Sequence, residues 1–230
     1  MSEEMSAVEA LADTEVLDLL LARAVWAGNQ GAVEFLLEQG ASPVAWPEEE
    51  SPEFDYGVAI INRAVIRGNA NIVRVLLDTG LVDVNGKYGD IDCRSAPVVF
   101  AAQYSSLGMV DLLLEYGALI DPVFEKYISL DLDGDCSTPL ISAIKENRSG
   151  MVQHLLYRGA NLDISLAEYP DMESSTLEKL LELGGDPQAM TRSGLLLLEV
   201  ANDLDNKHDA LLIEKYIAQK EKTGLLCRVY

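Results

Sequence analysis

The stretch APVVFAAQYSSLGMVDLLLEYGA, residues 96–118, decides the fold of this 230-residue chain. It begins with small and apolar residues, passes through a short polar turn, and ends in a run of leucines followed by glycine. Three further stretches align with it without internal gaps: LLLARAVWAGNQGAVEFLLEQGA (19–41), AIINRAVIRGNANIVRVLLDTG (59–80) and TPLISAIKENRSGMVQHLLYRGA (138–160). A weaker fifth copy ends in LEKLLELGGDP, residues 177–187. Self-similarity of this kind is typical of a stack of helical repeats.

Each copy predicts two short amphipathic helices that form a hairpin. A hairpin of this size cannot bury its apolar face by itself, so neighbouring hairpins must cover one another. Small residues such as Ala101 and Ala102 let the next hairpin approach, and the first leucine of each leucine pair fills the layer between repeats. These leucines are Leu36, Leu76, Leu113, Leu155 and Leu180. We therefore expect an all-α solenoid held together by nearest-neighbour contacts.

A glycine follows each leucine run at the same place in the repeat. The positions are Gly40, Gly80, Gly117, Gly159 and Gly184. Glycine adopts a positive φ at little cost, and helices often end on such a residue. We expect all five glycines to have positive φ and to terminate the second helix of their repeat.

The pattern resembles the ankyrin repeat, which runs T-P-L-H-x-A-A-x-x-G and then V-x-L-L-L-x-x-G-A-D-V-N. Thr138-Pro139-Leu140 matches its opening best, and Gly80–Asn85 matches its ending with one extra residue. The usual histidine is replaced by Ala22, Asn62, Val99 and Ile141. Successive final glycines are 40, 37, 42 and 25 residues apart, against about 33 in the family. The resemblance covers roughly residues 15–220. It implies an all-α ankyrin solenoid of about five to six helix-pair repeats with extended connecting loops, called fingers.

We expect a single domain over residues 1–230 with polar caps at both ends. The predicted boundaries are an N-terminal cap at about 1–21, repeats at about 19–57, 58–95, 96–137, 138–162 and 163–190, and a C-terminal cap at about 191–230. Helical spacing predicts helices over 9–21, 195–204 and 209–221. The first helix of the fifth copy, near 165–169, is expected to be cut short by Pro170.

Charge and cysteine content limit the class of protein. The chain has 38 acidic and 17 basic residues and a formal charge of −21, which repels nucleic acid and anionic lipid and attracts basic proteins. Three widely spaced cysteines, Cys93, Cys136 and Cys227, form no disulfide framework and favour a reducing compartment. The acidic N-terminus is not a secretory signal, and no apolar run approaches a membrane span. We expect a cytoplasmic protein.

The sequence offers no constellation for catalysis or metal binding. His154 lies in a leucine run and His208 in a charged turn, and neither has a nucleophile in a recognisable setting. Asp131–Asp135 suggests calcium, but an EF-hand loop that opened at Asp131 would need glycine and glutamate where Cys136 and Ser142 stand. We expect no enzymatic activity, no cofactor and no metal, and we interpret the acidic run as a turn before T-P-L.

The resemblance implies that a partner binds the concave face, built from the fingers and the exposed ends of the first helices. The helix positions are Trp26, Ile66, Arg67, Gln103, Tyr104, Lys145 and Glu146. The first finger supplies Trp46, Glu48, Glu49, Glu50, Glu53, Phe54, Asp55 and Tyr56. The second supplies Tyr88, Asp90 and Asp92, and the third supplies Asp131, Asp133 and Asp135. Rigid aromatic residues of this kind often dominate binding energy. Alternatively, Trp26 caps the core, and the finger aromatics cover the helices.

Two rival functions remain beside a protein-interaction module with a basic partner. In one, the chain is a stoichiometric inhibitor or immunity-type protein whose acidic face mimics nucleic acid, which requires a dense carboxylate array on the concave side. In the other it is an enzyme, which requires convergent titratable groups in a closed pocket. We expect a monomer that binds another protein and contacts neither nucleic acid nor membrane.

Overall fold

The structure, a computed structural model, describes residues 2–44, 59–86, 96–122, 138–169, 172–191 and 193–226, with backbone alone at 2–13 and 224–226. These residues form twelve α-helices and no strand, and one isolated antiparallel bridge joins Met190 to Leu196. The all-α fold class is therefore confirmed. The chain divides into two compact units, Met1–Cys136 and Ser137–Tyr230.

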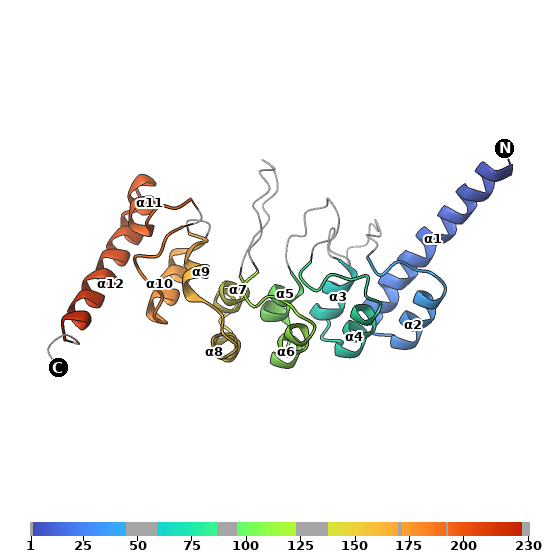
Figure 1. The fold of residues 1–230 in the computed structure, drawn as a ribbon, viewed down its shortest axis with the longest axis horizontal. Coiled ribbons are helices and arrows are strands. Elements are labelled where there is room, and N and C mark those ends of the chain that lie inside the picture. The colour runs from blue at the N-terminus through green and yellow to red at the C-terminus, as the bar shows by residue number, and fades with distance from the viewer. Residues whose placement is uncertain are drawn as a thin grey trace. The chain divides into compact units, whose positions relative to one another are not determined.

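Unit 1 contains three helix pairs in two rows (Figure 1). The first helices, called inner helices here, are α1 (Ser2–Ala27), α3 (Ile60–Ile66) and α5 (Pro97–Tyr104). The second, called outer helices, are α2 (Gln30–Glu38), α4 (Ala70–Asp78) and α6 (Leu107–Glu115). Each inner helix packs against the next, α1 against α3 and α3 against α5. The small residues of the pattern make this possible, since Ala64, Ala101 and Ala102 are fully buried.

The leucines and glycines predicted from the repeat occupy their expected places. Leu76, Leu113, Leu155 and Leu180 are fully buried, and Leu36 is 8% exposed. The five terminal glycines all have positive φ, between 70° and 104°. In the third repeat, the Ala118 N–H donates to the Leu113 carbonyl at 2.9 Å and the Gly117 N–H donates to Leu114 at 3.0 Å. This pair of bonds is a Schellman motif. Both predictions are confirmed.

Side chains also tie one repeat to the next at the residue two places after the terminal glycine. Asn85 Oδ1 accepts the Leu119 N–H at 2.8 Å, and its amide donates to the Gly117 carbonyl at 3.3 Å. Asp18 accepts the Ser42 N–H at 2.6 Å in the same way. The backbone N–H groups of Ser42 and Leu119 therefore each have a side-chain partner from an earlier part of the chain.

Unit 2 contains α7 (Pro139–Lys145), α8 (Ser149–Tyr157), α9 (Leu162–Leu166), α10 (Ser174–Glu182), α11 (Leu197–Asp203) and α12 (Lys207–Leu226). Helix α7 begins as the sequence indicates, because the Thr138 hydroxyl caps the Ile141 N–H at 3.2 Å and Pro139 is the first helical residue. A buried bond of 2.8 Å joins that hydroxyl to the Ser165 hydroxyl of α9.

Four predicted helices have different limits in the structure. Helix α1 is continuous from residue 2 to 27, so the expected cap helix 9–21 and the first repeat helix are one, since no glycine or proline interrupts them before Gly28. The short helix expected near 165–169 is α9, which starts earlier because Asn161 caps it. At the C-terminal end, α11 is shorter than 195–204, and α12 is longer than 209–221.

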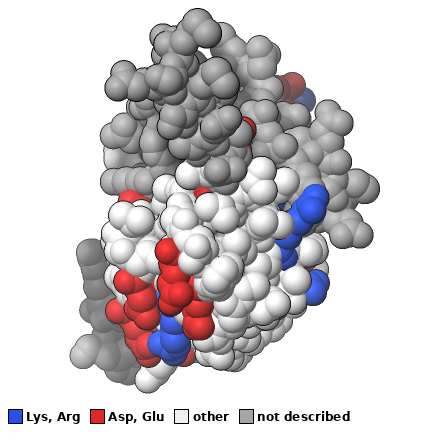
Figure 2. Space-filling view, turned by 90° about the vertical axis from the view of Figure 1, so that its right-hand side faces the viewer, with Lys and Arg blue, Asp and Glu red and all other residues white. Residues whose placement is uncertain are grey.

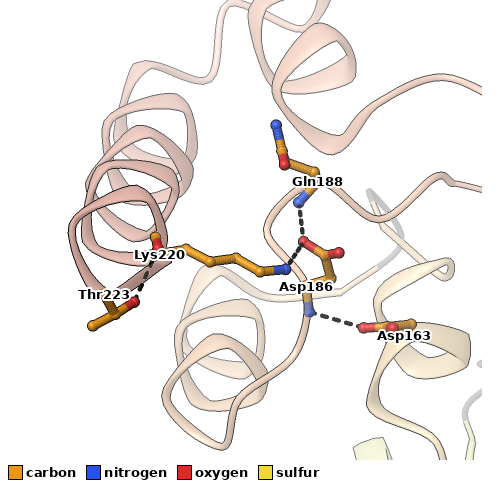
Figure 3. A network of polar contacts seen from close by, with 5 residues as sticks. All are labelled: Asp163, Asp186, Gln188, Lys220 and Thr223. Atoms are coloured by element: carbon orange, nitrogen blue, oxygen red, sulfur yellow. Dashed lines mark hydrogen bonds and ion pairs between the residues drawn. The ribbon is translucent and has the colours of Figure 1, made fainter. Parts of the chain in front are cut away.

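Helix α12 is fastened to the rest of unit 2 by a polar network (Figure 3). Lys220 Nζ lies 2.7 Å from Asp186 Oδ1, which also accepts the Gln188 N–H at 2.9 Å. The Asp186 N–H donates to Asp163 Oδ1 at 2.8 Å, the same inter-repeat bond seen at Asn85. The Lys220 bond, followed by that of the Gln188 amide, lowers the pKa of Asp186. The last helix is thereby joined to the fifth copy of the repeat.

A second contact of α12 is buried. The Tyr169 hydroxyl donates to Asp209 Oδ2 at 3.1 Å, and the Asn206 amide donates to the same oxygen at 2.8 Å. Tyr169 is 3% exposed and Asp209 is 1% exposed. Burial, and next the charge of Asp209, raise the pKa of Tyr169 to about 12.

We predict that Gly117→Ala destabilises the protein by about 1–2 kcal/mol through its left-handed backbone. A Cβ at Gly117 would meet nothing within 4 Å, so steric overlap would add nothing to this cost. Gly108→Ala, in helix α6 of the same repeat, is the matched control and should stabilise by about 1 kcal/mol or less. Thermal and urea unfolding measure both. Equal effects of the two substitutions would contradict the assigned helix ends.

We also predict that unit 2 loses stability at alkaline pH through Tyr169. Because its folded pKa lies above the ordinary value of 10, the stabilisation is fully present below pH 10 and is lost as the pH rises through about 12. Tyr169→Phe should flatten the fall of the melting temperature over that range. Tyr157→Phe, whose side chain is 85% exposed, should leave the pH profile unchanged. Identical profiles for wild type and Tyr169→Phe would contradict the linkage.

Candidate partner-binding surface

The turns that end the three inner helices of unit 1 lie beside one another. They are residues 26–29 (WAGN), 66–69 (IRGN) and 103–106 (QYSS), and we call them the inner-helix tips. A Cβ on Gly28 would lie 3.1 Å from the Asn69 amide nitrogen, and one on Gly68 would lie 3.9 Å from the Ser105 hydroxyl. The first tip therefore touches the second, and the second touches the third. Gly28 and Gly68 both have a φ of 71°, which allows these tight turns.

A cation–π contact links the first two tips. The guanidinium carbon of Arg67 lies 5.1 Å from the ring centroid of Trp26. Trp26 is half-buried and Arg67 is exposed. The Arg67 side chain makes no hydrogen bond or ion pair with any residue that the structure describes. The cation–π contact with this indole is the interaction that the structure gives for the Arg67 guanidinium.

The third tip presents an aromatic ring to solvent. Tyr104 is 54% exposed, and its ring stacks on Phe100 with centroids 6.4 Å apart and an interplanar angle of 25°. The neighbouring Gln103 and the Ile66 of the second tip are half-buried. A ring that is fixed by its neighbour and still open to solvent loses little entropy when a partner covers it.

Carboxylates are absent from the inner-helix tips, although the protein has a net charge of −21. On the outer helices, by contrast, exposed carboxylates occur at Glu34, Glu38, Asp78 and Glu115. Figure 2, which looks at the end of unit 1 that carries α1 and α2, shows acidic side chains gathered on one side of the described surface and a broad uncharged area beside them. Unit 1 therefore has distinct acidic and uncharged regions.

The turn that ends α7 in unit 2 differs from the inner-helix tips in its charge and in its lack of an aromatic residue. Lys145 is half-buried and Glu146 is exposed at the end of α7. Asn147 has a φ of 53° where Gly28 and Gly68 stand in the other turns. This turn carries charges of both signs and no aromatic residue.

The predicted finger residues lie outside the residues that the structure describes. They are Trp46, Glu48, Glu49, Glu50, Glu53, Phe54, Asp55, Tyr56, Tyr88, Asp90, Asp92, Asp131, Asp133 and Asp135. Their role in binding stays a prediction. The pairing of Arg67 with Trp26 was not foreseen, because the two residues are 41 positions apart and only the register of neighbouring repeats brings them together.

Features of metal or membrane proteins are also missing from the described part of the chain. No three His, Cys, Asp or Glu side chains there are grouped so that they could hold a metal ion. His154 is half-buried on α8, and His208 is exposed at the start of α12. None of the described helices is both long enough and apolar enough to span a bilayer.

Comparison with protein families identifies the repeat. Residues 21–123 match a model of ankyrin repeats in three copies, and residues 135–165 match a model of a single ankyrin repeat. A comparison with curated proteins found no match. Ankyrin repeats indicate a protein–protein interaction module, and proteins built from them are typically non-enzymatic. The matched segments, the helix pairs and the glycine-capped outer helices together show that the chain belongs to the ankyrin-repeat family.

Proposed function

We propose that this protein is a non-enzymatic binding module that recognises a partner protein through the inner-helix tips and the finger segments. The observation that carries the proposal is the Trp26–Arg67–Tyr104 surface of unit 1, where a stacked guanidinium and a 54% exposed aromatic ring lie on adjacent turns. Residues of these three types are the commonest hot spots of protein interfaces. Lys145 and Glu146, the predicted contacts in unit 2, stay a separate prediction.

Long-range electrostatics should favour a partner with a basic surface. A net charge of −21 attracts positive proteins and speeds their encounter, and salt screens this attraction. The exposed carboxylates of the outer helices and the five acidic residues of the first finger supply much of it. We further propose that the protein acts as a monomer in the cytoplasm, since its three scattered cysteines favour a reducing compartment.

The inhibitor alternative, in which an acidic face mimics nucleic acid, needs carboxylates at the binding surface. The inner-helix tips of unit 1 carry none, so this part of the molecule does not favour it. Within unit 1, the alternative now depends on the finger segments. We therefore retain general partner recognition as the proposed function.

Affinity capture from the cells that make the protein, with chemical cross-linking at low and at high salt, tests the proposal. We expect a directly cross-linked protein partner whose recovery falls as the salt concentration rises. Surface plasmon resonance then separates the contribution of the aromatic contact from that of the carboxylates. Tyr104→Ala should raise the dissociation rate by an amount equivalent to about 1–3 kcal/mol. Replacing Glu48, Glu49 and Glu50 by glutamine should mainly lower the association rate and flatten its salt dependence.

Tyr157→Ala is the control for these measurements, because Tyr157 is also highly exposed but lies on α8, the second helix of its pair in unit 2. It should leave both rates unchanged. No cross-linked protein, or a partner whose binding responds to Tyr157 and not to Tyr104 or the glutamates, would show that the proposed surface is wrong.

A further inference from the structure

The inner-helix tips of unit 1 have the opposite charge from the molecule as a whole. Their twelve residues, WAGN, IRGN and QYSS, contain one charged side chain, Arg67, and no carboxylate. The remaining polar groups are neutral amides and hydroxyls, including those of Asn69 and Ser105. Among the side chains of the tips themselves, Arg67 is therefore the charge that a contacting group meets.

Arg67 is held ready to bind an anion. Its guanidinium lies 5.1 Å from the Trp26 ring centroid and makes no hydrogen bond or ion pair with a described residue. The guanidinium N–H groups therefore have no hydrogen-bond partner among the described residues, and their planar fork matches the geometry of a carboxylate. Because the contact with Trp26 already restricts the side chain, a carboxylate that binds it loses less entropy than with a free arginine.

The surroundings of Arg67 indicate what else the ligand carries. Tyr104 offers an exposed ring on the next tip, Trp26 offers a half-buried one on the tip before, and Ile66 adds apolar surface. We infer that the inner-helix tips of unit 1 bind a partner segment in which a carboxylate lies beside an apolar or aromatic side chain. This inference rests on the proposed function and specifies the chemistry of the segment that reaches this surface.

The chain itself also carries carboxylates beside aromatic residues at 45–58. Because ankyrin repeats indicate a protein–protein interaction module, we assign the surface to a partner segment. Occupation of the surface by residues 45–58 is a separate outcome of the test below.

Selection of random linear peptides by the full-length protein tests the inference. Enriched peptides are synthesised and their affinities measured against wild type, Arg67→Gln, Arg67→Lys and Arg74→Gln. The last variant is the matched control, because it removes the same charge from the exposed face of α4 in the same repeat. Quenching of Trp26 fluorescence by acrylamide, in a Trp46→Phe background, reports whether each variant keeps the tip intact.

We expect the enriched peptides to contain Asp or Glu next to an aromatic or aliphatic residue. Arg67→Gln should weaken their binding about tenfold or more, Arg67→Lys should weaken it less, and Arg74→Gln should leave it unchanged. Replacing the peptide carboxylate by its amide should weaken binding to the wild-type protein by the same factor as Arg67→Gln does. The amide peptide and the carboxylate peptide should bind the Arg67→Gln variant equally well.

Three results would overturn the inference. One is enrichment of Lys- and Arg-rich peptides that are insensitive to Arg67→Gln, and another is equal loss with Arg67→Gln and Arg74→Gln. The third is tighter peptide binding after Glu48, Glu49 and Glu50 are replaced by glutamine, which would assign the surface to the chain's own segment. None of these excludes a partner captured from cells, whereas capture of no direct partner would count against the proposed function itself.

Discussion

Every helix pair in this protein has an apolar face that only a neighbouring pair can cover. Leu113 contributes to this packing through both its side chain and its backbone. Its side chain is fully buried in the layer between repeats, and its carbonyl accepts the Ala118 N–H that ends α6. The glycine between them must then have a positive φ, which Gly117 has at 90°. Packing, helix length and chain direction are therefore fixed together at one point in each repeat.

The first and last helices of the described chain have features that the other helix pairs lack. At the N-terminal end, α1 runs unbroken for 26 residues. At the C-terminal end, Lys220 reaches back to Asp186, which in turn bonds Asp163. The last helix thus uses an inter-repeat bond of the same kind as Asn85 makes in unit 1. These polar contacts complete the units where leucine packing stops.

The sequence predicted what depends on residues close together in the chain. The leucine runs and the terminal glycines are local patterns, and they correctly predicted the buried leucines and the glycines that end the second helices. The bonds of Asp18, Asn85 and Asp163 were missed, because an Asp or Asn in a loop does not indicate which amide it will accept from. The continuity of α1 was missed because repeat boundaries were placed where no helix breaker stands.

For the candidate site, too, the sequence predicted the positions of residues but not the contacts between repeats. The residue positions at the inner-helix tips follow from the repeat, so the sequence predicted that Trp26, Arg67 and Tyr104 lie at the ends of the first helices. Their relation was not, since the stacking of Arg67 on Trp26 depends on how closely two repeats pack. That stacking changes the interpretation of the surface. The molecule as a whole is acidic, whereas the tips of unit 1 carry one cation, Arg67, on the turn between those of Trp26 and Tyr104.

Amide hydrogen exchange of the protein with and without its captured partner tests most directly whether the inner-helix tips are the binding face. The account predicts slower exchange on binding at residues 26–29, 66–69 and 103–106, with little change along α2, α4 and α6. Protection confined to those outer helices, with the tips exchanging as in the free protein, would contradict it.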